Sequence, residues 1–373
     1  MRVLILGGGV IGTSIAYHLA AKGADVVVIE RSAVACAASG KAGGFLAQDW
    51  CDGTPLEHLA RRSFQLHAEL AEALGGDWGY RPMTTYGGIV GRSRPLRSRG
   101  TAPGWVSADV AITGQLGSGS TTAQVHPGAF TAAMMRAAQD GGAELHLGRA
   151  IALLRRGGDL AGVQLEDCSL DGDAVVVAMG PWSVLAAKWL ALPPVYGLKG
   201  HSLVFETGAL LPPEALFLEY AETAGSILSP EVFPRADGTT YVCGISSQAP
   251  LPIDPGRVTP DDGAIERLTA LCARLSPVLA GSPVLLSQAC YRPVTGDGLP
   301  LIGNVPGTRG AYVATGHGGW GILNAPATGE AIAELILDGA ARTIDLSPFD
   351  PARLAALDPR RVAISNRMQV SAA

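Results

Sequence analysis

The chain has 373 residues, which is enough for about two or three domains with a large apolar core. Charged residues make up 16% of the sequence and hydrophobic residues 47%, so disorder driven by charge is excluded. The formal net charge of −5 provides no basic field for nucleic acid, and we expect no nucleic-acid partner.

The cysteines and the N-terminal residues indicate the cellular compartment of the protein. The six cysteines lie far apart and form no CxxC pair, so neither a disulfide framework nor a metal site is expected. Residues 3–21 lack charge over a length that could cross a membrane, but four glycines and His18 interrupt this run. No basic segment or cleavage site typical of a signal peptide precedes it. The sequence therefore predicts a soluble, cytoplasmic protein without a membrane span.

The first 30 residues predict a strand, a tight turn, a helix and a second strand. Two short, largely apolar runs at 3–6 and 24–29 flank a helical segment that ends at Lys22 and Gly23. Apolar runs of this kind are typical of parallel strands that are buried on both faces.

The turn in this unit has the sequence GGGVIG at 7–12. Gly7, Gly9 and Gly12 have the GxGxxG spacing, and Glu30 ends the second strand. Without side chains at the first two glycines, backbone donors at the helix N-terminus can approach a pyrophosphate, while Gly12 lets the helix pack closely on the strand. Glu30 would accept hydrogen bonds from the hydroxyls of an adenosine ribose. The pattern predicts a dinucleotide site that NAD or FAD could fill.

The pattern is weaker in the next segment. A helix with a proline-containing cap at 54–57 is predicted up to the glycines at 75–76. Residues 84–122 show little periodicity. The basic residues in this segment are interpreted as a solvated loop, with an anion site as the alternative; they are Arg92, Arg94, Arg97 and Arg99.

The second half alternates between two kinds of pattern. A helix is predicted over 126–139, and strands are predicted over 143–147 and 174–179. Residues 195–250 contain short strand candidates separated by glycine and proline, which indicates one antiparallel sheet. A helix capped by Thr259 and Pro260 follows.

The end of the chain returns to the α/β pattern, with a strand at 311–315, a loop at 316–321 and a helix over about 325–337. The predicted fold class is α/β, a discontinuous Rossmann-type FAD-binding domain with an inserted α+β substrate domain. We expect the FAD-binding domain to comprise 1–82, 125–192 and 291–346. The substrate domain would comprise 83–124 and 193–290, and 347–373 would form a C-terminal tail.

The choice of FAD rests on the late loop, GHGGWG at 316–321. It lies between a strand and a helix, so a helix N-terminus there could stabilise negative charge on a reduced isoalloxazine ring. An NAD domain has no need of such a distant second element.

Six segments carry motifs that occur together in one family. They are GGGVIG at 7–12 with Glu30, ASGKAGG at 38–44, VVVAMGPWS at 175–183, PVYGLKGHS at 194–202, YRPVTGDGLPLIG at 291–303 and ATGHGGWGI at 314–322. In this order they resemble the FAD-dependent oxidoreductases that include D-amino-acid oxidase, glycine oxidase and monomeric sarcosine oxidase, and they are more similar to a less characterised branch than to glycine oxidase itself. The resemblance implies FAD contacts at Gly7, Gly9, Val10, Ile11, Gly12, Glu30, Arg31, Ser39, Gly43, Gly44, Gly180, Trp182, Gly316, Gly318, Gly319, Trp320, Gly321 and Ile322.

The resemblance also implies catalytic roles. Arg292 matches the arginine that binds a substrate carboxylate, and a guanidinium is suited to this because it can hold both carboxylate oxygens. The alternative is a structural arginine that bridges Asp297 or a loop carbonyl. His317 could donate to substrate or flavin, or pack for shape alone. Cys290 is a possible covalent link to the flavin, or a small buried residue.

The implied function is the oxidation of the C–N bond of a small amino acid or N-substituted amino acid. Hydride would pass to the flavin, the imine would hydrolyse, and dioxygen would be the acceptor. The sarcosine oxidase branch has a lysine that activates dioxygen, and the matching segment at 239–246 has none. A dehydrogenase that uses a quinone or carrier protein therefore stays open, as does a flavin-loaded assembly or interaction factor without turnover.

Overall fold

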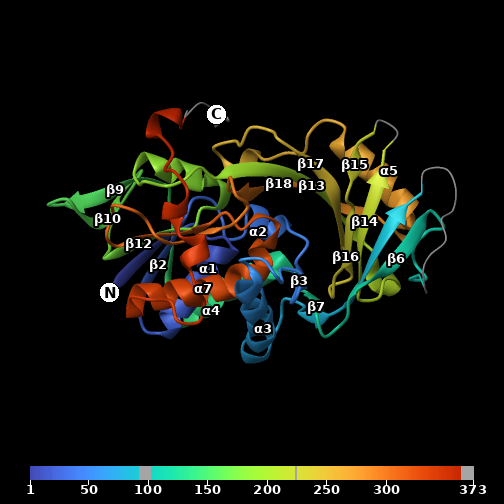
Figure 1. The fold of residues 1–373 in the computed structure, drawn as a ribbon, viewed down its shortest axis with the longest axis horizontal. Helices are drawn as coiled ribbons and strands as arrows, with labels where there is room; N and C mark the ends of the chain where they lie inside the picture. The colour runs from blue at the N-terminus through green and yellow to red at the C-terminus, as the bar shows by residue number, and fades with distance from the viewer. Residues whose placement is uncertain (92–101, 223–224, 363–373) are drawn as a thin grey trace.

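The computed structural model describes residues 1–91, 102–222 and 225–362. Figure 1 shows two lobes, a helix-flanked sheet on the left and a large sheet on the right. The four arginines at 92–99 lie outside the described residues. Among the described residues, no helix is both long and apolar enough to cross a membrane.

The first lobe is built on a six-stranded sheet. Its order is β19 (Leu301–Asn304), β20 (Ala311–Thr315), β12 (Ala174–Val177), β1 (Arg2–Leu6), β2 (Asp25–Glu30) and β8 (Glu144–Leu147). All neighbours pair in parallel except β19 and β20. The strands at the centre are buried on both faces, as their apolar sequences require. The carboxyl ends of the parallel strands therefore meet at one edge.

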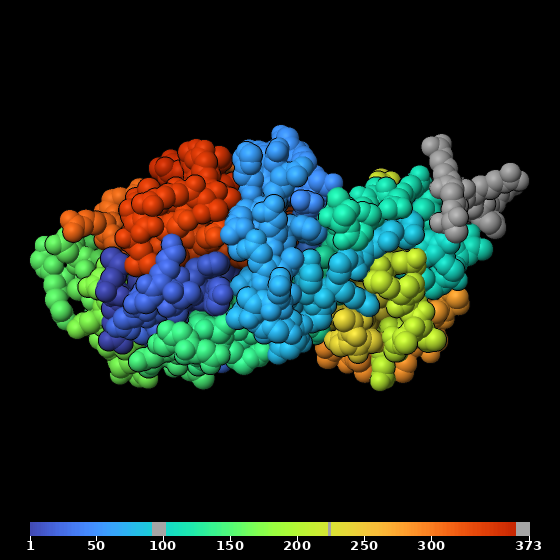
Figure 2. Space-filling view, turned by 90° about the horizontal axis from the view of Figure 1, so that it is seen from below, coloured from blue at the N-terminus to red at the C-terminus, as the bar shows by residue number. Residues whose placement is uncertain are grey.

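Four helices cover one face of this sheet: α1 (Val10–Ala21), α3 (Glu57–Ala73), α4 (Pro127–Asp140) and α7 (Gly321–Asp338). Figure 2 shows this face, with α7 in red, α1 in dark blue, α4 in green and α3 in light blue. Helix α7 begins at Gly321, so the prediction of a start near 325 placed it one turn late. The apolar loop residues before Ala325 are helical because they are buried against the helix layer.

The opposite face carries elements that the sequence analysis did not predict. The 3-10 helix η1 (Gly180–Lys188) packs there through Val184, and a small sheet packs there through Val163 and Leu165. These residues join Leu4 and Val27 in one apolar cluster. The small sheet has the order β11 (Ser169–Asp171), β10 (Asp159–Leu165) and β9 (Ala150–Arg156).

The second lobe is built on an eight-stranded sheet. Its order is β18 (Val284–Val294), β13 (Tyr196–Glu206), β17 (Thr239–Ser247), β16 (Glu231–Pro234), β14 (Glu214–Ala221), β5 (Thr84–Val90) and β6 (Val110–Gly117), with β15 (Ile227–Leu228) beside β14. The strands predicted within 195–250 pair with one another in antiparallel, as expected. Strand β14 also pairs in parallel with β5, which lies outside that range. The weakly patterned segment 84–122 supplies two strands of this sheet, β5 and β6.

Helix α5 (Ala264–Leu275) packs on this sheet through Leu268 and Cys272. It begins after Gly263, so the prediction of a cap at Thr259 and Pro260 was wrong. The other elements are α2 (Ala38–Lys41), α6 (Pro277–Gly281), β3 (Phe45–Ala47), β4 (Arg81–Pro82), β7 (Thr122–Gln124), η2 (Gly208–Leu210), η3 (Pro255–Arg257), η4 (Gly318–Trp320), η5 (Ser347–Phe349), η6 (Pro351–Arg353) and η7 (Pro359–Arg361). Strand β18 continues past residue 291, and the proposed division into domains stays a prediction.

Candidate functional site

A pocket with a cavity volume of about 450 Å³ follows the carboxyl ends of the parallel strands. It starts at Glu30, passes the glycine turn at Gly7 and Gly9, and ends between Arg292 and Trp320. Ligands of open α/β sheets bind at this edge. The pocket therefore joins the predicted cofactor residues of the first lobe to strands of the second.

The glycine turn brings α1 against β1. Gly7 has φ of +116°, and a Cβ added at Gly12 would lie 1.9 Å from the carbonyl oxygen of Gly7. Val10 is the first residue of α1, and its backbone N–H donates to Ser39 Oγ at 2.9 Å. No acidic residue occupies the first turn of α1, so its positive end is open to an anionic group in the pocket.

Glu30 is fixed at the start of the pocket. Its Oε2 accepts from the backbone N–H of Gly8 at 2.7 Å, and its Oε1 accepts from that of Ser32 at 2.8 Å. Each carboxylate oxygen can accept a further hydrogen bond, so Glu30 both closes the turn and presents acceptors to a ribose.

Replacing Glu30 with Ala is expected to weaken FAD binding by ~1.5–3 kcal/mol, because a charged acceptor is lost. Titration of the apoprotein with FAD measures this change. Asp25→Ala is the matched control, since Asp25 begins the same strand and lies exposed at its other end. Equal FAD affinity in the Glu30→Ala variant and wild type would show that Glu30 does not contact the cofactor.

At the other end, the loop of 316–321 leads through η4 into α7. His317 is buried there, and its Nε2 lies 3.1 Å from Thr328 Oγ1. Burial lowers the pKa of His317 to about 3, so the ring is neutral near pH 7. Its Nδ1 is buried and has no hydrogen-bond partner among the described residues. His317 can therefore form one further hydrogen bond in the pocket but carries no charge.

Arg292 is the cation of this end. It lies on β18, and its guanidinium reaches over Gly200, where an added Cβ would come within 3.7 Å of Nη2. No hydrogen bond or ion pair joins Arg292 to another side chain of the described chain. Asp297 is instead paired with Arg353, whose Nε lies 2.8 Å from Oδ2. The alternative role of Arg292 as the partner of Asp297 was therefore wrong.

An aromatic wall lines this end of the pocket. Phe45 and Phe233 stack with their ring centroids 5.3 Å apart, and Trp50 and Trp320 meet edge to face at 6.3 Å. Trp320 belongs to a sequence motif, whereas the aromatic residues that the large sheet contributes carry no motif. These are Phe217, Phe233 and Tyr241, which line the pocket beside Glu231.

The structure places most of the predicted site residues along the pocket. Gly12 and Gly316 do not line it; Gly12 packs against the turn and Gly316, with φ of +80°, lies against Thr295. The pocket-lining ones are Gly7, Gly9, Val10, Ile11, Glu30, Arg31, Ser39, Gly43, Gly44, Gly180, Trp182, Cys290, Arg292, His317, Gly318, Gly319, Trp320, Gly321 and Ile322.

Cys290 lines the pocket two residues before Arg292. Burial raises the pKa of its thiol, while the positive charges of Arg292 and Lys41 act in the opposite direction. Lys41 comes from α2, and its Nζ donates to the carbonyl of Ala289 at 3.3 Å. Strand β17 has no lysine.

Acid precipitation tests whether Cys290 is linked to the flavin. A covalent bond leaves yellow colour in the pellet, and the Cys290→Ala variant then releases it into the supernatant. Because burial favours the unreactive thiol form, we expect free flavin in the supernatant of the wild type.

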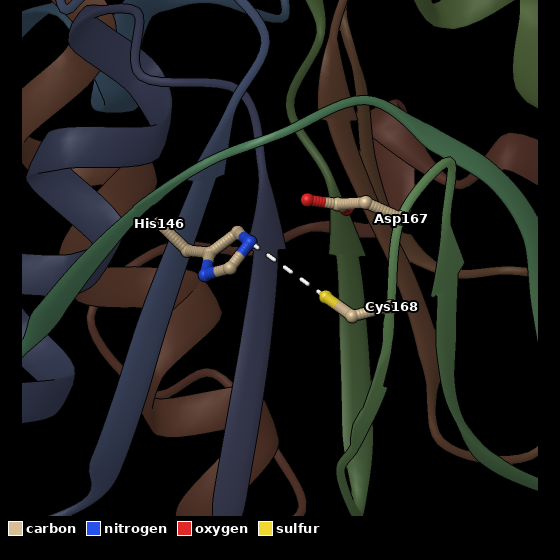
Figure 3. Close-up of side chains that lie close together, drawn as sticks. All are labelled: His146, Asp167 and Cys168. Carbon is tan, nitrogen blue, oxygen red and sulfur yellow. Dashed lines mark hydrogen bonds between the residues drawn. The ribbon is translucent and has the colours of Figure 1, made fainter.

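A second group of polar residues lies outside the pocket. Figure 3 shows His146 on β8 facing Asp167 and Cys168 in the turn between β10 and β11. Their ligand atoms lie within 4.8 Å of one another, a spacing that could hold a metal ion. The approach of Cys168 Sγ to His146 Nε2, at 3.9 Å, is accounted for by a weak hydrogen bond, and Asp167 is exposed. We therefore assign no ion to this group.

The pocket residues fit FAD. The glycine turn leaves a cradle that a Cβ would fill, and Glu30 supplies acceptors at one end. The N-terminus of the 18-residue helix α7 and the unpartnered Nδ1 of His317 supply polar groups at the other.

Comparisons with known proteins agree with this fit. Residues 2–335 match the sequence profile of the FAD dependent oxidoreductase family (DAO). A protein of Schizosaccharomyces pombe described as an oxidoreductase is 30% identical, with 94% of this chain and 97% of the relative covered. The glycine oxidase of Pseudomonas putida is 28% identical, with 94% and 98% covered. The crystal structure of glycine oxidase from Geobacillus kaustophilus has a TM-score of 0.79 and 25% identity, with 94% and 99% covered. The chain therefore belongs to the FAD dependent oxidoreductase (DAO) family, and it is an FAD-dependent flavoenzyme.

Proposed function

We propose that the protein oxidises the C–N bond of a small amino acid or N-substituted amino acid. The observation that supports this most directly is Arg292, a guanidinium in the cofactor pocket that no described side chain meets in a hydrogen bond or ion pair. A permanent cation in such a place is suited to a carboxylate ligand. Relatives named glycine oxidase and a neighbour named L-amino acid deaminase support the same substrate class.

In this proposal FAD supplies a hydride acceptor, and the protein supplies position and environment. Arg292 holds both oxygens of the substrate carboxylate, which fixes the direction of the α-carbon hydrogen. The wall formed by Phe45, Trp50 and Trp320 limits the access of water. His317 is neutral and offers a hydrogen bond without adding charge.

Hydride transfer from the substrate amine does not require a strong base. The amino group of a bound zwitterion first gives up one proton to solvent. The resulting neutral amine loses hydride from its α-carbon to give an iminium, and the iminium loses its N–H proton to give the imine. Water then hydrolyses the imine to a carbonyl compound and an amine or ammonia. The side chains have to orient the substrate more than they have to move protons.

Dioxygen is the proposed final acceptor. The alternative is a dehydrogenase that passes electrons to a quinone or carrier protein, and the absence of lysine on β17 keeps that alternative open. Lys41, on α2, is a cation near Cys290: its Nζ donates to the carbonyl of Ala289, and its charge opposes the rise in the pKa of Cys290.

Turnover on a substrate panel tests the proposal. Glycine, sarcosine, proline and both alanine enantiomers are supplied in air, and the carbonyl product and peroxide are measured. Carbonyl product with equal peroxide supports an oxidase, whereas carbonyl product that requires an added quinone supports the dehydrogenase. Turnover of a 2-hydroxy acid but of no amine would overturn the proposed C–N oxidation.

A further inference from the structure

Glu231 is a carboxylate in the same end of the pocket as Arg292. It begins β16 and lies opposite Cys243 of β17 in the sheet register. The Cys243 thiol donates to Oε2 at 3.4 Å. No other side-chain hydrogen bond or ion pair of Glu231 is found in the described part of the chain, so Oε1 has no protein donor.

The surroundings of Glu231 are nearly free of other charge. The side chains beside it, Phe233, Tyr241 and Cys243, are apolar or neutral, because burial raises the pKa of both the tyrosine and the cysteine well above their usual values. Burial also raises the pKa of Glu231, and the positive charge of Arg292 opposes that shift.

The two charged groups face one pocket without touching. No ion pair within 4.0 Å joins Glu231 to Arg292, although each influences the pKa of the other. Both residues are half-buried, and groups of opposite charge that are largely removed from water ordinarily pair directly or bind something between them. A ligand with one negative and one positive end would satisfy both side chains.

We propose that Glu231 binds the amino group of the substrate while Arg292 binds its carboxylate, so that the pocket selects zwitterionic amino acids over simple carboxylates. This inference rests on the proposed function and names the residue that selects the amine. Glu231 is thus a specificity-determining residue that the sequence motifs did not indicate.

A pair of matched ligands tests the role. 2-Aminoisobutyrate has no α-hydrogen and therefore cannot reduce the flavin, and trimethylacetate has the same shape with methyl in place of ammonium. Binding of each is followed by the change in the flavin absorption spectrum of the FAD-loaded protein. The measurement is made at mildly alkaline pH, where the carboxylate form of Glu231 is favoured.

In the Glu231→Gln variant, we expect 2-aminoisobutyrate to bind about tenfold or more weakly, because a charged hydrogen bond is lost. Trimethylacetate should bind equally well or more tightly, because a negative charge near Arg292 is removed. A side chain that serves only as a counter-ion for Arg292 gives a different result: the variant would then bind both ligands more tightly. Such a parallel change, or no change for either ligand, would overturn the inference.

Controls separate this outcome from other failures. Glu219→Gln, on an exposed position of β14, should leave both affinities unchanged. Flavin content and the unfolding temperature of Glu231→Gln establish that the variant is folded, and Glu231→Asp, which keeps the charge, should bind 2-aminoisobutyrate better than Glu231→Gln does. If the pocket is too small for this pair, glycine and propionate form the smaller one, and the affinity for glycine is then taken from the concentration dependence of anaerobic flavin reduction. If no amino acid perturbs or reduces the flavin of the wild type, the proposed function itself fails.

Discussion

Arg292→Lys is expected to lower kcat/KM for a carboxylate substrate by ~10- to 100-fold while leaving the FAD content unchanged. Lysine keeps the positive charge but replaces a planar fork by a single ammonium, so one of two hydrogen bonds to the carboxylate is lost. Most of the loss should be in KM, with a smaller decrease in kcat because the α-carbon is held less rigidly. Steady-state kinetics on the best amino acid of the panel measures both.

The control for this variant is Arg353→Lys. Arg353 is paired with Asp297 and lies outside the pocket lining, so its replacement should change stability more than substrate affinity. If Arg292→Lys and wild type have the same KM for every carboxylate substrate, Arg292 does not bind the carboxylate.

Gly12→Ala is expected to have the largest effect on the cofactor. The added Cβ would lie 1.9 Å from the carbonyl oxygen of Gly7, a contact that backbone atoms cannot relieve by a rotamer change. Helix α1 has to move away from β1, which costs about 3 kcal/mol and displaces the turn that faces the pocket. The purified variant should therefore lose most of its flavin and unfold at a lower temperature than the wild type.

Gly114→Ala provides the comparison. Gly114 lies on β6, and an added Cβ there meets no atom within 4 Å. This variant should retain full flavin content. Flavin retention by Gly12→Ala at the wild-type level would contradict the close packing of α1 on β1.

The sequence was most informative where the site is local. The first strand, the glycine turn and Glu30 lie within 30 consecutive residues. Gly7 adopts the positive φ of the turn, and Gly12 allows the close approach of helix and strand. The prediction of a strand, turn, helix and strand was therefore confirmed closely. The same holds for β20, whose bounds match the predicted strand at 311–315.

The sequence was least informative where the site depends on register. Glu231 belongs to a four-residue strand, and it shares the pocket with Arg292 only because β16 and β18 belong to one sheet, with β17 and β13 between them. Phe217 depends on the parallel pairing of β14 with β5, two segments more than a hundred residues apart. Neither pairing has a local signal, so the second half of the pocket could not be derived from periodicity.

The cofactor domain was also incompletely predicted for a physical reason. The β9–β11 sheet is amphipathic and short, and its apolar residues, such as Val163 and Leu165, are buried only by the sheet on which it packs. Strands β9 and β11 contain no fully buried residue, so they lack the regular buried positions by which a strand is told from a loop in a sequence.

Anaerobic mixing of the FAD-loaded protein with amino acids tests the central claim most directly. We predict that at least one small amino acid or N-substituted amino acid bleaches the oxidised flavin spectrum without any added electron acceptor. Arg292→Lys should need a higher concentration of the same compound for the same rate. A flavin that stays oxidised with every amino acid, but is bleached by an uncharged amine or a 2-hydroxy acid, would contradict the proposed function.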